Sequence, residues 1–209
     1  ADLANAPWQT LSATALPVVL GAAALAAALI LVLFPLLRRY ALARPNARSS
    51  HTIPTPQGGG IAVIAATLVT FGAAHAIGGN TLASSQLLAV IAATVGLALL
   101  GMTDDIRPLA AGLRLAVQAL AVGLVVATLP DDVRIVSAVP LAIERAAIAV
   151  GLVWFVNLVN FMDGIDWMSV AEIVPVTGGL AVLTALGALP PLGGLVALAL
   201  CGAMLGFAP

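Results

Sequence analysis

The chain has 209 residues, of which 62% are hydrophobic and 8% are charged, with a formal net charge of −1 and no lysine. This composition excludes a soluble globular domain, which has no use for that much apolar surface, and indicates an all-α, polytopic membrane protein. The chain offers no basic surface to a nucleic acid. Its single cysteine, Cys201, cannot form an internal disulfide.

Uncharged stretches separated by charges, glycines and prolines predict the helices in chain order, because about 20 apolar residues cross a bilayer. Gly78-Gly79-Asn80 divides one long uncharged stretch into two helices. Pro130-Asp131-Asp132 ends the fourth helix, Gly164 ends the fifth, and Pro190-Pro191 separates the last two. The prediction is a bundle of about seven transmembrane helices at about 14–37, 59–77, 84–103, 113–129 and 141–162, with two more after Glu172, the last charged residue.

The arginines predict the orientation, because basic residues in short flanking segments favour the cytoplasmic side. With the N-terminus outside, segments 38–57, 104–112 and 163–171 face the cytoplasm, and only Arg134 and Arg145 fall outside. The chain begins with Ala1 and stops after an apolar stretch at Pro209. We therefore expect a single transmembrane domain over 1–209 that is truncated at its C-terminus. The six arginines on the cytoplasmic side are Arg38, Arg39, Arg44, Arg48, Arg107 and Arg114.

Two adjacent carboxylates, Asp104 and Asp105, follow the third apolar span. Like charges repel at this distance, and the negative end of the helix dipole adds to the cost. A bound cation would relieve both penalties. The alternative is a solvated helix end that Arg107 partly neutralises.

The end of the fifth span carries a more specific pattern of oxygen side chains. Asn157, Asn160 and Asp163 recur every three residues, which places them on one face of a helix. Gly164 allows a tight turn that brings Asp166 near Asp163. Amide and carboxylate oxygens suit Mg²⁺. The alternative is that the asparagines hydrogen-bond to neighbouring membrane helices.

A loop rich in proline and glycine, from Arg48 through His51 to Gly58, Gly59 and Gly60, opens the second span. Glycines let a ligand approach the backbone, and a helix N-terminus can hold a phosphate. Arg48 and His51 could add charge or hydrogen bonds. The alternative is a plain turn between helices, since the glycine run fits neither GxGxxG nor a P-loop.

Three segments, at 51–60, 101–105 and 157–166, resemble in order and spacing the signature blocks of the polyprenyl-phosphate N-acetylhexosamine-1-phosphate transferases. The resemblance runs from about Arg38 onward, and the first block is most similar to the branch that starts O-antigen and related surface glycans. Such enzymes transfer a sugar-1-phosphate from a UDP-N-acetylhexosamine to undecaprenyl phosphate and release UMP. The resemblance implies a multi-pass protein of the bacterial inner membrane with a cytoplasmic, Mg²⁺-dependent site, with Mn²⁺ as the alternative ion.

The resemblance also implies residue roles. Asp104 and Asp105 would position or deprotonate the lipid phosphate. Asn160 and Asp163 would bind the metal, and Asp163 and Asp166 belong to the catalytic motif. His51 would belong to the substrate loop. The chemistry of the loop and of the helix face adds Arg48, Gly58, Gly59 and Asn157 as candidate substrate-binding residues.

The chain departs from the family pattern in two ways. Trp167 stands where the motif usually continues with glycine, which leaves the identity of the UDP-sugar open. The family also continues beyond the equivalent of Pro209 with a Gly-Asp segment and a loop containing histidine, so the 209-residue chain is expected to be inactive alone. Two other functions stay open, a transporter or channel subunit with polar residues along an ion path and a non-catalytic membrane scaffold. The sequence also leaves the oligomeric state open, with a homodimer among the candidates.

Overall fold

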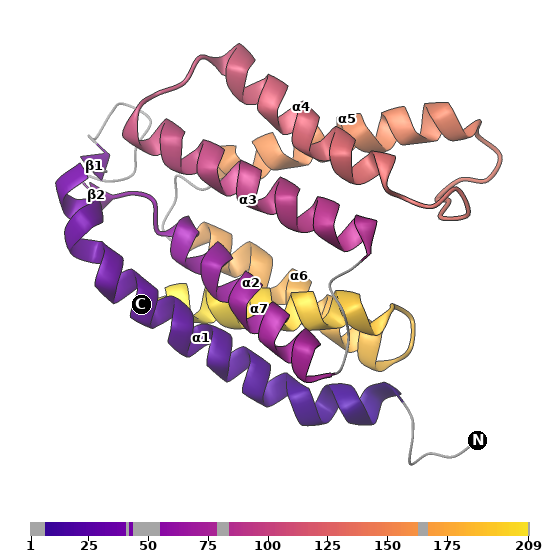
Figure 1. The fold of residues 1–209 in the computed structure, drawn as a ribbon, viewed down its shortest axis with the longest axis horizontal. Helices are drawn as coiled ribbons and strands as arrows, with labels where there is room; N and C mark the ends of the chain where they lie inside the picture. The colour runs from indigo at the N-terminus through magenta and orange to yellow at the C-terminus, as the bar shows by residue number, and fades with distance from the viewer. Residues whose placement is uncertain (1–6, 41, 44–54, 79–83, 163–166, 209) are drawn as a thin grey trace. The chain divides into compact units, whose positions relative to one another are not determined.

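The computed structural model describes residues 7–40, 42–43, 55–78, 84–162 and 167–208. These residues form seven helices and a two-stranded antiparallel ribbon, which pairs Leu42 with Pro56 and Ala43 with Thr55. The elements are α1 (Pro7–Tyr40), β1 (Leu42–Ala43), β2 (Thr55–Pro56), α2 (Gly60–Ile77), α3 (Ser85–Ile106), α4 (Ala111–Ala127), α5 (Leu141–Met162), α6 (Met168–Ala185) and α7 (Pro191–Phe207) (Figure 1).

The predicted all-α architecture with about seven helices is confirmed, although α6 begins at Met168 and not after Glu172, because helical structure here includes the charged residue. Five of the seven helices are long and apolar enough to cross a membrane, by length and composition. The other two, α4 and α7, have 17 residues each, close to the lower limit for a crossing of about 17 residues. Few side chains of the longer helices are buried inside the structure, which is typical of helices whose apolar surfaces face lipid.

Local sequence explains where the helices begin. The Ser84 hydroxyl accepts a hydrogen bond from the Leu87 backbone N–H at 3.2 Å, so Ser84 caps the N-terminus of α3. Pro191 opens α7, a position where its missing N–H costs nothing. Pro7 likewise is the first residue of α1, so this helix begins earlier than the predicted start near Thr14.

The contacts divide the chain into two compact units, and the first contains residues 1–81 and 165–209. In this unit α7 contacts α1, α2 and α6, and α1 also packs against α2 (Figure 1). Small and medium-sized apolar side chains form its core. They are Ala22 and Ala26 of α1, Val63 and Ala66 of α2, Val170 of α6, and Ala203 and Met204 of α7.

Glycines of α7 allow the closest helix contact in this unit. A Cβ atom at Gly202 would lie 2.8 Å from the Val19 Cα atom and would overlap the Val19 carbonyl. A Cβ at Gly206 would meet the Ala23 backbone in the same way. Gly202 and Gly206 are four residues apart, the small-xxx-small pattern that lets membrane helices approach closely.

We predict that Gly202→Val lowers the thermal stability of the protein in detergent, because the added side chain forces α1 away from α7. Overpacking of this kind costs about 1–3 kcal/mol. The control is Gly193→Val, also on α7, where an added Cβ meets no atom within 4 Å. Equal melting temperatures for the two variants would contradict the close contact between α1 and α7.

The second unit contains residues 82–164 and holds α3, α4 and α5. Helix α4 contacts both α3 and α5 (Figure 1). The buried apolar residues of this unit include Leu87, Ala93 and Val122, whereas the side chains of Leu120 and Val150 are more than 70% exposed. Exposed leucine and valine on these helices fit a surface that contacts lipid.

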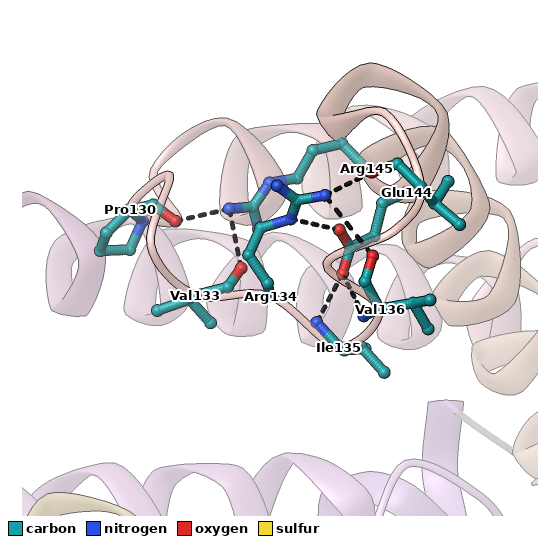
Figure 2. A network of polar contacts seen from close by, with 8 residues as sticks. Pro130, Val133, Arg134, Ile135, Val136, Glu144 and Arg145 are labelled. Carbon is teal, nitrogen blue, oxygen red and sulfur yellow. Dashed lines mark hydrogen bonds and ion pairs between the residues drawn. The ribbon is translucent and has the colours of Figure 1, made fainter.

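The segment that joins α4 to α5 is held by a polar network (Figure 2). The buried Glu144 carboxylate accepts hydrogen bonds from Arg134 Nε at 2.5 Å and from the backbone N–H groups of Ile135 and Val136 at 2.5 and 3.1 Å. The Arg145 guanidinium donates to the carbonyl of Pro130 at 2.5 Å. Glu144 lies near the start of α5, so the network stabilises the end of this unit opposite to the last turns of α5.

Candidate functional site

A polar cavity of about 100 Å³ lies within the second unit, where the end of α3, the first half of α4 and the end of α5 meet. Residues from three separate parts of the sequence line it. They are Leu97, Leu100, Gly101 and Asp104 of α3, Arg114 and Gln118 of α4, and Val156, Asn157 and Asn160 of α5. Three predicted site residues, Asp104, Asn157 and Asn160, are therefore brought together.

Asp104 lies in the last turns of α3, and both of its carboxylate oxygens are engaged. Oδ1 accepts a hydrogen bond from the Leu109 backbone N–H at 2.7 Å, and Oδ2 pairs with Arg114 Nη1 at 2.7 Å. The first contact fixes the turn between α3 and α4, and the second fixes the direction of the Arg114 side chain. The cation beside Asp104 is thus Arg114 of the next helix, whereas the sequence had suggested Arg107.

Arg114 and Gln118 also line the polar cavity, although neither was predicted from the sequence as a site residue. They are four residues apart on α4, so they lie on one face of the helix. Arg114 is partly exposed, with 38% of its side chain accessible, whereas Gln118 is buried. The available signal was this pair of polar side chains on one face of an otherwise apolar helix.

Asn157 and Asn160 both line the cavity from the last turns of α5, as their spacing predicted. The Asn157 Nδ2 group donates to Gln118 Oε1 at 2.8 Å and to the Val153 carbonyl at 2.8 Å. For Asn157, therefore, the alternative of a hydrogen bond to a neighbouring helix is also realised. The same side chain faces the cavity and joins α5 to α4.

An apolar cavity of about 210 Å³ lies beside the polar one in the same unit and shares Leu97 and Val156 with it. Of the residues that the structure describes, Thr94 is the one polar side chain that lines it. The two cavities give the unit a polar end next to an apolar region, which fits a ligand with a charged head and a hydrocarbon tail. The lining comes from α3 (Val90, Ala93, Thr94, Leu97), α4 (Ala121, Val122, Val125) and α5 (Leu152, Phe155, Val156).

Other predicted site residues lie elsewhere or outside the described residues. Asp105 follows Asp104 in α3 and has an exposed side chain, but it is not among the residues that line the cavity. Arg48, His51, Asp163 and Asp166 lie outside the described residues.

Gly58 and Gly59 belong to the first unit, just before α2. Gly58 has a φ of 91°, a left-handed conformation that favours glycine. A Cβ at Gly59 would lie 2.8 Å from the Phe207 ring of α7. Backbone conformation and packing therefore account for both glycines in the structure, and their predicted role in substrate binding stays a prediction.

Trp167 comes directly before α6 and has a φ of 66°. This left-handed conformation is uncommon for a residue with a side chain. The family motif usually has glycine at this position. The left-handed backbone of Trp167 is one that glycine adopts easily, so the backbone fits the family pattern although the side chain does not. The Trp167 side chain is 60% exposed.

The side chains that line the polar cavity provide only part of a site for a hard divalent cation. Among the described residues, no group of three or more His, Cys, Asp or Glu side chains could hold a metal ion. Asn160 in the polar cavity offers an amide oxygen, a ligand type that Mg²⁺ accepts. Asp104 is engaged by Arg114 and Leu109 through one hydrogen bond at each oxygen, so each oxygen keeps a lone pair that could contribute to a cation site.

A comparison with protein families matches residues 87–209, more than half of the chain, to "Glycosyl transferase family 4". The match begins in α3 and continues through α7, so it includes every residue that lines the polar cavity. A comparison with curated proteins gave no match. Membership of a membrane-enzyme family supports a multi-pass enzyme over a transporter or a scaffold. The chain thus belongs to glycosyl transferase family 4, the family of the polyprenyl-phosphate hexosamine-1-phosphate transferases.

Proposed function

We propose that this protein transfers a sugar-1-phosphate from a UDP-N-acetylhexosamine to undecaprenyl phosphate, releases UMP, and so initiates a surface glycan such as O-antigen. The observation that carries the proposal is the polar cavity in which Asp104, Arg114, Asn157 and Asn160 meet. The adjoining apolar cavity supports a lipid substrate, because it would accept hydrocarbon next to the polar residues.

The reaction is a phosphoryl transfer. An oxygen of the lipid phosphate forms a bond to the β-phosphorus of the UDP-sugar, and the bond between that phosphorus and the bridging oxygen to the α-phosphate breaks. UMP leaves with the bridging oxygen. Such reactions depend mainly on alignment and on neutralisation of negative charge.

The residues of the cavity have separate roles in this proposal. Arg114 binds a phosphate, since a guanidinium matches phosphate oxygens in geometry and charge. Asp104 holds Arg114 in place through the 2.7 Å ion pair. Asp105 accepts the proton of the lipid phosphate, and Asn157 contacts the UDP-sugar.

Asn160 and Asp163 would hold Mg²⁺, or Mn²⁺ in its place, which supplies positive charge beside the diphosphate. Asp166 completes the acidic motif, and Arg48, His51, Gly58 and Gly59 contribute to substrate binding. In this proposal the chain acts as a single catalytic domain, whose active site faces the cytoplasm at the bacterial inner membrane, with the N-terminus outside.

The test uses the complete purified protein in detergent or vesicles with UDP-N-acetylglucosamine, UDP-N-acetylgalactosamine and undecaprenyl phosphate, in the presence of Mg²⁺. The expected result is UMP and a lipid-linked sugar diphosphate with one of the two donors, and no UMP when the lipid phosphate is left out. Release of UDP instead of UMP would contradict transfer of a sugar phosphate.

A further inference from the structure

The hydrogen bond between Gln118 and Asn157 joins two helices inside the polar cavity. Asn157 Nδ2 donates to Gln118 Oε1 at 2.8 Å, and Gln118 is only 7% exposed. The two residues lie 39 positions apart in the sequence and belong to α4 and α5. No role for Gln118 was predicted from the sequence.

The direction of the Asn157 amide follows from its second contact. The Val153 carbonyl can only accept a hydrogen bond, so the Asn157 atom that faces it at 2.8 Å must be the nitrogen. A primary amide nitrogen has two hydrogens, and the Val153 carbonyl and Gln118 Oε1 take one each. Both donors of Asn157 are thus used within the protein, and its Oδ1 atom is the polar atom left to act as an acceptor.

The same reasoning orients Gln118. Because Asn157 presents its nitrogen, the Gln118 atom that faces it must be the acceptor Oε1. Without that acceptor the Asn157 amide would lose one of the two contacts that hold it, and it could turn about its side-chain bonds. Gln118 therefore restricts a residue that lines the cavity.

We propose that Gln118 is a positioning residue, which holds Asn157 so that the Asn157 Oδ1 atom accepts a hydrogen bond from a hydroxyl or N–H group of the UDP-sugar. This inference rests on the proposed function. Gln118 acts through Asn157 and does not itself contact the donor substrate in this proposal. Its loss weakens donor binding more than it slows the chemical step.

The test is a double-mutant cycle in the complete protein with Gln118→Met, Asn157→Leu and the double variant, with UMP release as the assay. Gln118→Met keeps the length of the side chain but removes the acceptor, and is expected to raise KM for UDP-N-acetylglucosamine, or for whichever donor the protein uses, about tenfold, with kcat changed by less than about threefold. In the Asn157→Leu background, Gln118→Met is expected to have no further effect. The matched control is Gln86→Met at the exposed start of α3, with unchanged KM.

A second variant guards against misfolding. Gln118→Glu keeps an acceptor oxygen at the same reach, so the hydrogen bond from Asn157 persists, but it adds a negative charge at a buried position in the proposed phosphate site. Its KM is expected to lie between the values of the unmodified protein and of Gln118→Met. Additive effects in the cycle, or an unchanged KM for Gln118→Met, would overturn the positioning role while UMP release by the unmodified protein upholds the proposed function. Absence of UMP release by the unmodified protein would count against the proposed function and, with it, this inference.

Discussion

Asp163→Asn in the complete protein is expected to abolish UMP release from the UDP-sugar while expression stays normal. Asp163 comes three residues after Asn160, and we assign both to the divalent cation. Asparagine keeps the size of the side chain but removes the negative charge that would help to hold the cation. Loss of a group that stabilises charge in the transition state costs about a hundredfold to a thousandfold in kcat, and loss of the metal itself costs more.

The control for this variant is Asp132→Asn, the same change at an exposed carboxylate in the segment between α4 and α5. It is expected to leave UMP release unchanged, because this segment adjoins the end of α5 opposite to Asn157 and Asn160. Undiminished turnover of Asp163→Asn would remove Asp163 from the site.

The second large effect is expected for Arg114→Ala, which removes the one cation that lines the polar cavity in the part of the chain that the structure describes. We expect kcat/KM for undecaprenyl phosphate to fall about a hundredfold, since a charge-assisted contact to phosphate is lost and Asp104 is left without its partner. Arg114→Lys is expected to recover only part of this loss, because lysine keeps the charge but not the two parallel N–H donors. The measurement is the formation of lipid-linked product at several concentrations of undecaprenyl phosphate.

Arg107→Ala provides the comparison for Arg114. Arg107 directly follows α3 and is exposed, and it was the partner that the sequence suggested for the two carboxylates. The ion pair between Asp104 and Arg114 predicts a much smaller effect for Arg107→Ala. A larger loss with Arg107→Ala than with Arg114→Ala would contradict the roles that the structure supports.

Most of the fold could be predicted from the sequence, because charges, glycines and prolines mark the ends of the apolar spans. The fifth span was predicted at 141–162, and α5 has these bounds. The prediction was less accurate for α1, which begins at Pro7 and ends at Tyr40. Hydropathy reports where a helix can cross a membrane, whereas helical structure continues into the polar flank through Arg38 and Arg39.

The site was predictable where adjacent carboxylates at the end of an apolar span marked Asp104, and where polar residues follow one another at helical spacing. Asn157 and Asn160 gave that signal, and both line the cavity. No sequence pattern identified the partner of Gln118, because its hydrogen bond with Asn157 depends on how α4 packs against α5. The partner of Asp104 was likewise decided by the turn after α3, which brings Arg114 rather than Arg107 to the carboxylate.

We propose that the transfer of a sugar phosphate from nucleotide to lipid takes place in the polar cavity of α3, α4 and α5. The most direct test of this claim follows the β-phosphorus of ³²P-labelled UDP-N-acetylglucosamine, or of the matching donor, with the unmodified complete protein and with Asn160→Ala. We predict that the label enters the lipid fraction with the unmodified protein and that Asn160→Ala transfers at least about a hundredfold less. Label that stays in the nucleotide, or equal transfer by the two proteins, would contradict the claim.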